Sequence, residues 1–487
     1  MANALWTLAT FQLALAFVPI STQQRHSTCL FSSSLPKPID PSGWPLRFPA
    51  KEHCSRCGLC ETTLVSHVQD ACAFLGDGMS RMDQMEEQVH GRTRSVESMV
   101  WDADRNKTSL AEEARFGVLR EPVFLARGIG IPDAQWTGCV TAICQTMLEE
   151  GLVDAVVCIA SDAEGGWSSP IPIVAKTVDD VMRGRGVKPS LAPSLQVLDQ
   201  IKGDPTIRRL LFCGVGCAVQ AFRAIEKDLN LEKVYVLGTN CVDNSPTPNA
   251  AREFVRNGVK IGSDDIKGYE FMQDFRVHVK TGDSYIKRPY FVLPGTIAEA
   301  SIATSCLACF DYTNGLADVV VGYMGAPLDG NDRMDEAFQT ITIRNDNGAA
   351  MLQATMAKNR LQRYDFATGK GSHEMIARAT VSSDSVVLKM IAEPVLEKGM
   401  PRVLGEVMAT VLRVVGPKGV SFARYSIDYH ILRNYLHVLH QWGPERAKQH
   451  LPRYSWVIVQ HYIATDSVFA DLCTKVIRMR VVEYDSP

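Results

Sequence analysis

The chain has 487 residues, of which 46% are hydrophobic and 22% are charged, a composition typical of an ordinary globular protein. Its length suggests two to four domains. A formal net charge of −3 excludes the strongly basic surface that nucleic-acid-binding proteins need, so we expect no nucleic-acid partner.

Residues 1–39 differ from the rest because they contain no Asp or Glu. The apolar run Leu5–Val18 is too short to span a bilayer comfortably, and a stretch rich in hydroxyl and basic side chains follows it. This pattern is similar to the two-part leader of plastids of secondary endosymbiotic origin, in which a pair such as Ala16-Phe17 marks the first cleavage. We therefore expect a plastid protein whose mature chain has no transmembrane segment. An ordinary secretory signal is the alternative.

The first cysteine group is Cys54-x-x-Cys57-x-x-Cys60, followed by Cys72. This triple spacing is typical of the start of a four-iron cluster site, which needs four thiolates. A structural zinc site is the alternative, since two Cys-x-x-Cys pairs also bind zinc. A disulfide framework is a third reading, but such frameworks occur mostly in short secreted chains. The spacing favours an iron–sulfur cluster, with Cys72 as the least secure ligand.

Helical and strand patterns alternate after the cysteine-rich start. We expect a helix over Thr137–Glu150 and a strand over Ala155–Ala160. A βαβ unit follows, with strands Arg209–Cys213 and Lys233–Leu237 on either side of a helix over Cys217–Leu229.

The turn Gly214-Val-Gly216 does not complete a dinucleotide-binding fingerprint, because Val219 stands where the third glycine is needed. The turn does place Cys217 in the first turn of a helix, where partial positive charge lowers a thiol pKa. Cys241 follows the next parallel strand and should open onto the same crevice. Cys306 and Cys309 supply the two further thiols that a second cluster needs. Buried core positions are expected for the other cysteines: Cys29, Cys139, Cys144, Cys158, Cys213 and Cys473.

Further along the chain, the patterns predict strands around Phe271–Val279, at Tyr290–Leu293 and at Ala317–Gly322. Helices are expected over Val403–Val415 and Asp428–Gln441. The expected fold is mixed α/β, with an N-terminal iron–sulfur module, an α/β flavin and iron–sulfur core with βαβ units, and a helical C-terminal region. The expected boundaries are a leader at 1–39, the iron–sulfur module at 40–110, two parts of the core at 111–205 and 206–400, and the helical region at 401–487.

With these residues in view, the chain resembles the beta-subunit family of deazaflavin-reducing hydrogenases and dehydrogenases. The resemblance extends from about His53 to about Tyr462. It is carried by long strings that include the segments 53–60, 70–79, 135–138, 211–217, 237–244, 269–274, 309–314, 317–325, 416–419 and 423–430.

The resemblance implies one FAD and two [4Fe-4S] clusters, with reduced ferredoxin as the electron source. Cys54, Cys57 and Cys60 match one cluster motif, and the four later cysteines match the other. The implied FAD site lies around the residues at the start of the first expected core helix: Gln135, Trp136, Thr137, Gly138 and Thr141. The alternative is an ordinary helix start with Thr137 as N-cap.

The implied reaction is a two-electron reduction of a chlorophyll-type pigment, at a 7-hydroxymethyl group or, as the alternative, at an 8-vinyl group. An electron-relay subunit without catalysis is the alternative of a different class, and a homo-oligomer stays open. The catalytic residues are unknown. The proton-donor candidates are Asp311, Tyr312, Asp243 and Lys188, while His90 and His278 are expected to be solvated or packed histidines.

Overall fold

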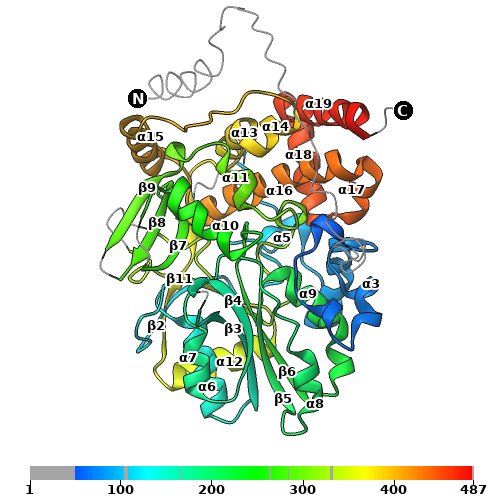
Figure 1. The fold of residues 1–487 in the computed structure, drawn as a ribbon, viewed down its shortest axis with the longest axis vertical. Coiled ribbons are helices and arrows are strands. Elements are labelled where there is room, and N and C mark those ends of the chain that lie inside the picture. The colour runs from blue at the N-terminus through cyan, green and yellow to red at the C-terminus, as the bar shows by residue number, and fades with distance from the viewer. Residues whose placement is uncertain are drawn as a thin grey trace, which may run out of the picture. The chain divides into compact units, whose positions relative to one another are not determined.

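The computed structural model describes residues 50–484 apart from 104–107, 165, 263–264, 283 and 329–332. Its largest sheet has eight strands in the order β12-β2-β11-β10-β6-β5-β3-β4 and lies in the lower half of Figure 1. The strands of this sheet are β2 (Phe124–Gly128), β3 (Ala155–Asp162), β4 (Gly166–Ala175), β5 (Arg209–Gly214), β6 (Lys233–Thr239), β10 (Val319–Gly322), β11 (Gln339–Ile343) and β12 (Leu361–Phe366).

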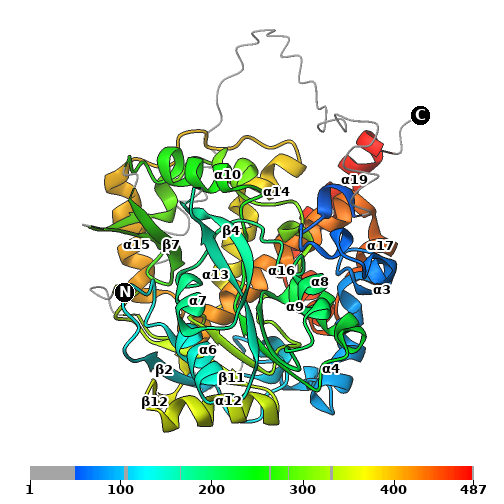
Figure 2. The ribbon, with the colours of Figure 1, turned by 60° about the horizontal axis from the view of Figure 1, so that its bottom comes forward.

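The four central strands β3, β5, β6 and β10 are parallel, and antiparallel strands complete both edges. Helices cover both faces, as Figure 2 shows. They include α6 (Cys139–Glu149), α7 (Val178–Arg183), α8 (Leu198–Gly203), α9 (Gly216–Ile225) and α12 (Asp346–Ala357). The fold is therefore mixed α/β, as expected.

Successive strand residues point to opposite faces, and this alternation divides the core into two layers. Leu210 and Phe212 pack with Phe222 of α9 on one face. Leu211 lies on the other face, with Ile143 of α6 and Leu352 of α12. The predicted βαβ unit is confirmed, because β5 and β6 are parallel neighbours and α9 connects them.

A smaller antiparallel sheet follows, with β7 (Ile266–Met272), β8 (Arg276–Thr281) and β9 (Tyr285–Pro289). The stretch expected as one strand region at Phe271–Val279 is divided by a turn between β7 and β8, where Phe275 has φ +60°. The strand expected at Tyr290–Leu293 is wrong. Tyr290–Val292 form the 3-10 helix η8, and Pro289 and Pro294 on either side lack the N–H groups that a strand ladder needs.

The C-terminal region is helical, as expected, and lies beside the N-terminal module, drawn in blue in Figure 1. Its helices are α13 (Glu374–Ser383), α14 (Ser385–Met390), α15 (Arg402–Val415), α16 (Val420–Trp442), α17 (Pro444–His450), α18 (Arg453–Thr465) and α19 (Ser467–Tyr484). Among the described residues, no helix is long and apolar enough to cross a membrane.

The remaining elements are short. A third sheet contains β1 (Thr108–Leu110), β13 (Thr368–Lys370) and β14 (Lys418–Gly419). The short helices are η1 (Lys51–His53), η2 (Leu59–Glu61), η3 (Val65–His67), α3 (Val68–Ala71), η4 (Gly78–Arg81), α4 (Met82–His90), η5 (Val96–Ser98), α5 (Glu113–Phe116), η6 (Glu226–Leu229), α10 (Pro248–Glu253), η7 (Phe254–Gly258), α11 (Ile297–Ser301) and η9 (Cys306–Ala308).

A buried charge network joins the segment before β2 to α16. The Arg115 guanidinium donates to both carboxylate oxygens of Asp428, at 2.7 and 2.9 Å, and to Glu112 at 2.7 Å. Arg424 donates to the other oxygen of Glu112 at 2.9 Å, and the Tyr462 hydroxyl donates to Asp428. Because these side chains are almost completely buried, each charge depends on its partner.

We predict that Asp428→Asn destabilises the fold by about 3–5 kcal/mol, because it leaves the buried Arg115 short of a counter-charge. Urea unfolding followed by circular dichroism measures the change. The matched control is Glu121→Gln, which removes a partly exposed partner of Arg363 and should cost less than about 1 kcal/mol. Equal effects of the two substitutions would contradict this account of the network.

Candidate metal centres and an adjoining pocket

The first cysteine set lies on a chain of short turns. Cys54 follows η1, Cys60 lies in η2, and Cys72 is the C-cap of α3. Between them Gly58 has φ +92°, and a Cβ there would lie 2.8 Å from the backbone nitrogen of Gln196. Only glycine fits this turn, which allows thiols close in sequence to approach one another.

The second cysteine set gathers residues from three distant segments. Cys217 lies in the first turn of α9, Cys241 lies two residues after the end of β6, and Cys306 and Cys309 lie at η9. The Asn244 side-chain amide donates to the Cys241 sulfur at 3.2 Å. The topology therefore places this set beyond the carboxyl ends of β5 and β6, where open α/β sheets bind ligands.

Electrostatic coupling shows which thiols are neighbours. The charge of Cys72 raises the pKa of Cys54 and Cys57, and the charge of Cys60 raises the pKa of Cys54 and Cys72. Within the second set, the charge of Cys217 raises the pKa of the other three members, which are Cys241, Cys306 and Cys309. These neighbours are the two expected ligand sets, although their iron ligation stays a prediction.

The two sets are also adjacent to each other. The Ser55 side chain, within the first motif, is hydrogen-bonded to Cys217 of the second set. The charge of Cys217 also raises the pKa of Cys57, and the charge of Cys72 raises the pKa of Cys217. Two clusters bound at these positions would be neighbours, which is what electron transfer between them requires.

The thiols of each set are farther apart than the sulfurs around a bound zinc ion. Tetrahedral zinc with Zn–S bonds of about 2.3 Å would bring its sulfurs to about 3.8 Å from one another. Among the described residues, the one group of three or more His, Cys, Asp or Glu ligand atoms within 4.8 Å of one another contains no cysteine. No three thiols of either set lie within 4.8 Å of one another, and eight thiols are the number that two cubanes need, so two iron–sulfur clusters stay the prediction.

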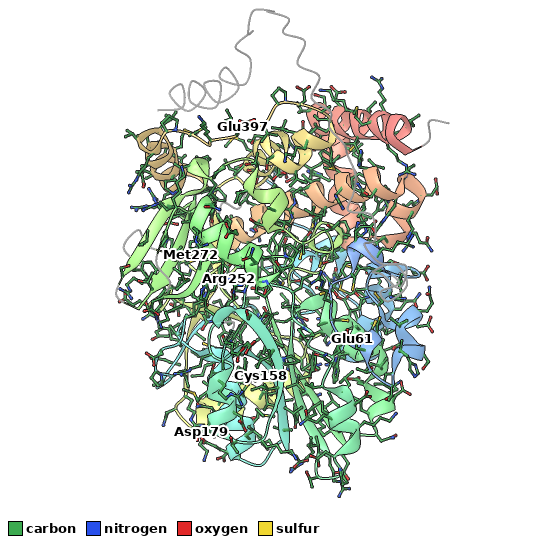
Figure 3. The ribbon with its side chains drawn as sticks, viewed as in Figure 1. Glu61, Cys158, Asp179, Arg252, Met272 and Glu397 are labelled. Atoms are coloured by element: carbon green, nitrogen blue, oxygen red, sulfur yellow. The ribbon has the colours of Figure 1, made fainter. Side chains whose placement is uncertain are left out.

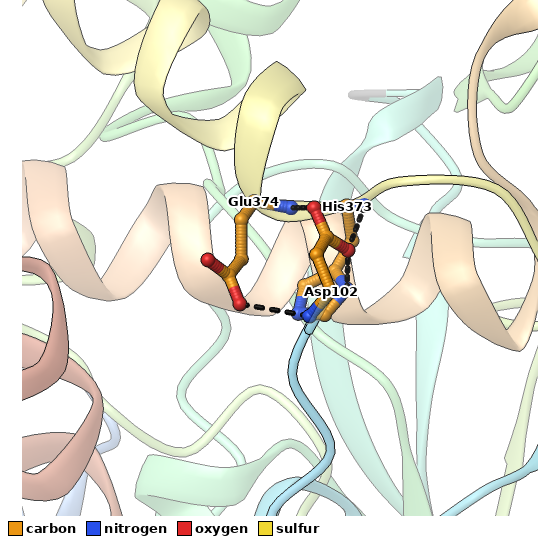
Figure 4. Close-up of side chains that lie close together, drawn as sticks. All are labelled: Asp102, His373 and Glu374. Carbon is orange, nitrogen blue, oxygen red and sulfur yellow. Dashed lines mark hydrogen bonds and ion pairs between the residues drawn. The ribbon is translucent and has the colours of Figure 1, made fainter. Parts of the chain in front are cut away.

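That one close group consists of Asp102, His373 and Glu374 (Figure 4). Asp102 accepts hydrogen bonds from the backbone N–H groups of His373 and Glu374 at the start of α13, at 2.9 and 3.0 Å. It also lies 2.9 Å from the His373 ring. These bonds satisfy the carboxylate as a helix cap, so the arrangement is explained without a metal ion.

Burial dominates the thiol chemistry. It raises the pKa of Cys54 and Cys217 to about 11 and that of Cys306 to about 12. At Cys217 burial outweighs the opposing effect of the backbone N–H of Ala218, in the first turn of α9, which lowers the thiol pKa. Thiols in such surroundings give up their protons when a cation binds, so metal binding here should release protons.

The remaining cysteines are core residues, as expected. Cys139, Cys144, Cys158 and Cys213 belong to the hydrophobic layer between the sheet and α6, and Figure 3 labels Cys158 on β3. The Cys144 and Cys213 sulfurs lie 3.3 Å apart. Cys473 packs in the other layer, while Cys29 lies outside the described residues.

An open pocket of about 540 Å³ lies at the carboxyl end of β2. Its walls include Arg127, Trp136, Thr137, Lys280 and Asp335. The Nε atom of Arg127 is buried and has no hydrogen-bond partner, and Lys280 is paired with Asp335 at 2.8 Å. The Arg127 guanidinium lies over the Phe338 ring, 4.1 Å from its centroid, so the pocket combines a cationic side chain with the Trp136 ring.

Some of the residues expected to contact FAD line this pocket, and others lie outside it. Trp136 and Thr137 line it. Gln135 is buried, with its amide group bonded to Glu270 and to the backbone of Val187, and Thr141 is buried in α6.

The N-cap of α6 is Gly138, with φ +86°, so Thr137 as N-cap is wrong. The Thr137 hydroxyl instead accepts from the backbone N–H of Gly128 and donates to Gln339. The Thr137 side chain therefore fixes the turn between β2 and α6 through its bonds with Gly128 of β2 and Gln339 of β11.

The structure also gives partners to the proton-donor candidates. Asp243 pairs with Arg433 through two bonds of 2.7 Å, and Lys188 donates to three backbone carbonyl groups. The Tyr312 hydroxyl donates to the carbonyl of Cys309, and one oxygen of the buried Asp311 accepts from Gly315.

Both histidines in question are packed. His90 contacts the carbonyl of Gly315, and His278 lies between Asp274 and Tyr285. None of these residues faces the pocket, whose walls hold neither the histidines nor the proton-donor candidates.

Sequence reasoning missed two residues of this region, Arg127 and Glu270. Glu270 lies on β7 and accepts from the Gln135 amide at 3.1 Å and from the Trp136 indole at 3.5 Å. A lone acidic residue in the otherwise apolar and aromatic strand Tyr269–Met272 is the only sequence signal for it.

Comparisons with known proteins identify the family. Two models match: the coenzyme F420 hydrogenase/dehydrogenase beta subunit N-terminus over residues 126–199, and the C-terminus of the same subunit over 207–367. The chain is 44% identical to the 7-hydroxymethyl chlorophyll a reductase of Oryza sativa, over 88% of this chain and 85% of that protein. This chain belongs to the coenzyme F420 hydrogenase/dehydrogenase beta-subunit family.

Other members and one solved structure are more distant. An uncharacterized protein of Nostoc is 37% identical over 89% of this chain and 99% of that protein. A chain of the F420-reducing [NiFe] hydrogenase complex from Methanosarcina barkeri is similar with a TM-score of 0.46 and 19% identity, over 62% of this chain and 99% of that chain. That score supports no further conclusion.

The two family models divide the site. The N-terminal model contains Trp136 and Thr137 of the pocket, and the C-terminal model contains Cys217, Cys241, Cys306 and Cys309. The first cysteine set precedes both models. The family domain thus carries the pocket and the second set, while the first set belongs to the preceding segment.

We predict that Cys217→Ala removes one four-iron cluster, because a cubane held by three thiolates is labile. Iron and acid-labile sulfide analysis of anaerobically purified protein should fall from about eight irons per chain to about four. The matched control is Cys213→Ala, four residues away in the core, which should keep the full content. Loss of iron from the control and not from Cys217→Ala would overturn the ligand assignment, and stoichiometric zinc without sulfide would overturn the cluster assignment.

Proposed function

We propose that this protein reduces 7-hydroxymethyl chlorophyll a to chlorophyll a, with reduced ferredoxin as electron donor and with FAD and two [4Fe-4S] clusters as cofactors. The single observation that carries the proposal is the 44% identity to a reductase of this name, over 88% of the chain. The cysteine sets and the adjoining pocket support it independently, because they supply the parts that such chemistry needs.

Two clusters would connect a one-electron donor to a two-electron reaction. Ferredoxin gives one electron at a time, whereas the reduction takes two. We place electron entry at the first set, and the hydrogen bond of Ser55 with Cys217 would connect this set to the second one. The protein's contribution is to hold both sets adjacent and largely out of water.

The pocket beside Trp136 fits a flavin. Trp136 offers an aromatic side chain, Arg127 offers a positive charge that suits a phosphate, and Thr137 also lines the pocket. A bound flavin would store two electrons and give them up together. Lys280 is already paired with Asp335, so Arg127 is the cation that remains for the cofactor at this pocket.

The reaction must balance. The C–O bond of the hydroxymethyl group breaks, a C–H bond forms, and the oxygen leaves as water. Two electrons come from two reduced ferredoxins, and two protons are consumed. The site therefore needs a proton source as well as an electron path.

We place the enzyme in a plastid, because the rice relative is named as chloroplastic and residues 1–39 have the composition of a two-part leader. We predict that these residues direct a fused fluorescent protein to the stroma of an algal plastid of secondary endosymbiotic origin. The readout is fluorescence microscopy against chlorophyll autofluorescence. A fusion of residues 50–88 is the control, and secretion of the leader fusion would reject the plastid assignment.

The assay of function uses purified protein, ferredoxin and a ferredoxin-reducing system, with 7-hydroxymethyl and divinyl pigments supplied separately. We expect chlorophyll a to form from the hydroxymethyl pigment, as measured by chromatography, and NADPH alone to support no turnover. Conversion of only the 8-vinyl group would assign the alternative reaction. Absence of pigment reduction, with clusters that nevertheless accept electrons from ferredoxin, would indicate a relay subunit.

A further inference from the structure

Glu270 is a partly buried carboxylate of β7 that has no cationic partner among the described residues. Its neighbours are three neutral donors: the Gln135 amide at 3.1 Å, the Trp136 indole N–H at 3.5 Å and the Tyr323 hydroxyl. Within the described part of the chain, no lysine or arginine acts on it. In contrast, Asp428 and Asp243 are each paired with an arginine.

A carboxyl group in such surroundings binds a proton readily. Burial raises the pKa of Glu270 to about 7, against the opposing effect of its three hydrogen-bond donors. The titratable groups around it are Tyr323 beyond β10, Tyr269 on its own strand, Tyr290 of η8 and His278 opposite it on β8. Burial raises the pKa of all three tyrosines.

His278 does not act as a counter-ion for Glu270. Its two ring nitrogens are bonded to Asp274 and to the Tyr285 hydroxyl, at 2.9 Å each. Burial also lowers the pKa of His278, against the opposing effect of its bond with Asp274. Near neutral pH, Glu270 is therefore the group at this position that changes its charge.

The position of Glu270 connects the pocket with the second cysteine set. Trp136 is a wall of the pocket, and its ring stacks on Tyr323 with centroids 4.7 Å apart. Tyr323 in turn is close enough to Cys241 to be affected by its charge. Met272, labelled in Figure 3, packs with Trp136 from the same strand as Glu270.

We propose that Glu270 is the proton source of this site, a carboxyl group that gives up one of the two protons consumed when the hydroxymethyl group is reduced. The inference rests on the proposed function, since it assigns a role within that reaction. The carboxyl group is re-protonated from solvent after each turnover. Its partial exposure permits this exchange, and the Tyr323 hydroxyl, bonded to it, extends the proton path toward Trp136.

The test compares Glu270→Gln and Glu270→Asp with the unaltered enzyme across pH. The active form is protonated, so the unaltered enzyme should lose kcat as pH rises through about 7. Glu270→Gln keeps the acceptor for Gln135 and Trp136 but has no acidic proton. Its kcat should fall about 100-fold, with a KM change below about threefold and no loss of rate near pH 7.

Controls separate a role in proton supply from a structural role. Glu270→Asp retains an acidic proton and should recover at least about tenfold of the lost rate. Glu397→Gln, an exposed glutamate on the connection before α15, should match the unaltered enzyme. If Glu270→Gln lost its flavin or cluster absorption, Glu270→Asp with intact absorption would provide the comparison. A pH profile of kcat in Glu270→Asp identical to that of the unaltered enzyme would overturn the proposal.

A second readout does not depend on turnover. Infrared difference spectra between pH 6 and pH 8 should contain the C=O stretch of a protonated carboxyl group that titrates near pH 7 in the unaltered protein. This band should be absent from Glu270→Gln and present in Glu397→Gln. Persistence of the band in Glu270→Gln would reject the assignment even if no pigment is reduced, whereas failure of pigment reduction by the unaltered enzyme would refute only the proposed function.

Discussion

Helix α16 holds the second cysteine set together, and the proposed electron path depends on that arrangement. The Asn434 amide lies 2.8 Å from the carbonyl oxygens of both Cys306 and Cys309. The neighbouring Arg433 forms two bonds of 2.7 Å with Asp243, two residues after Cys241. Two successive residues of one buried helix therefore position three of the four thiols, although these thiols come from separate loops. Breaking a buried pair of this kind costs about 3–5 kcal/mol, so the loops are firmly held.

From this anchor the parts of the site follow one another in space. The first set contacts the second through Ser55 and Cys217, and Tyr323 lies between Cys241 and the Trp136 wall of the pocket. Electrons and protons would thus meet at the same place. Electrons would arrive through buried sulfur atoms, and the proton would come from a carboxyl group that burial keeps protonated near neutral pH. Both effects depend on excluding water, which raises the pKa of thiol and carboxyl alike.

Local spacing made much of this arrangement predictable. The Cys-x-x-Cys-x-x-Cys run is a local pattern, and the βαβ unit is marked by apolar runs on either side of Gly214-Val-Gly216, so both could be read from the sequence. The proximity of Cys217 and Cys241 followed from parallel strands ending at the same edge of the sheet. These inferences needed only neighbours along the chain and one rule of topology.

The features that the sequence did not reveal depend on packing between distant segments. Glu270 matters because β7 brings it to Trp136, some 134 residues earlier. The contacts of α16 with Cys306 and Cys309 span 125 residues or more. Thr137 looked like an N-cap because its side chain suits one, but Gln339 from β11 engages its hydroxyl instead. The prediction of a strand at Tyr290–Leu293 was wrong because Pro289 and Pro294, on either side of this apolar run, lack the N–H groups that a strand ladder needs.

The proposed electron path depends on two four-iron clusters that lie next to each other in one chain. Electron paramagnetic resonance of the fully reduced protein tests it most directly, because adjacent reduced clusters couple magnetically. We expect about two spins per chain, with lines that are split or broadened by mutual interaction. A single unsplit signal of one spin per chain, or no iron–sulfur signal from protein of full iron content, would contradict it.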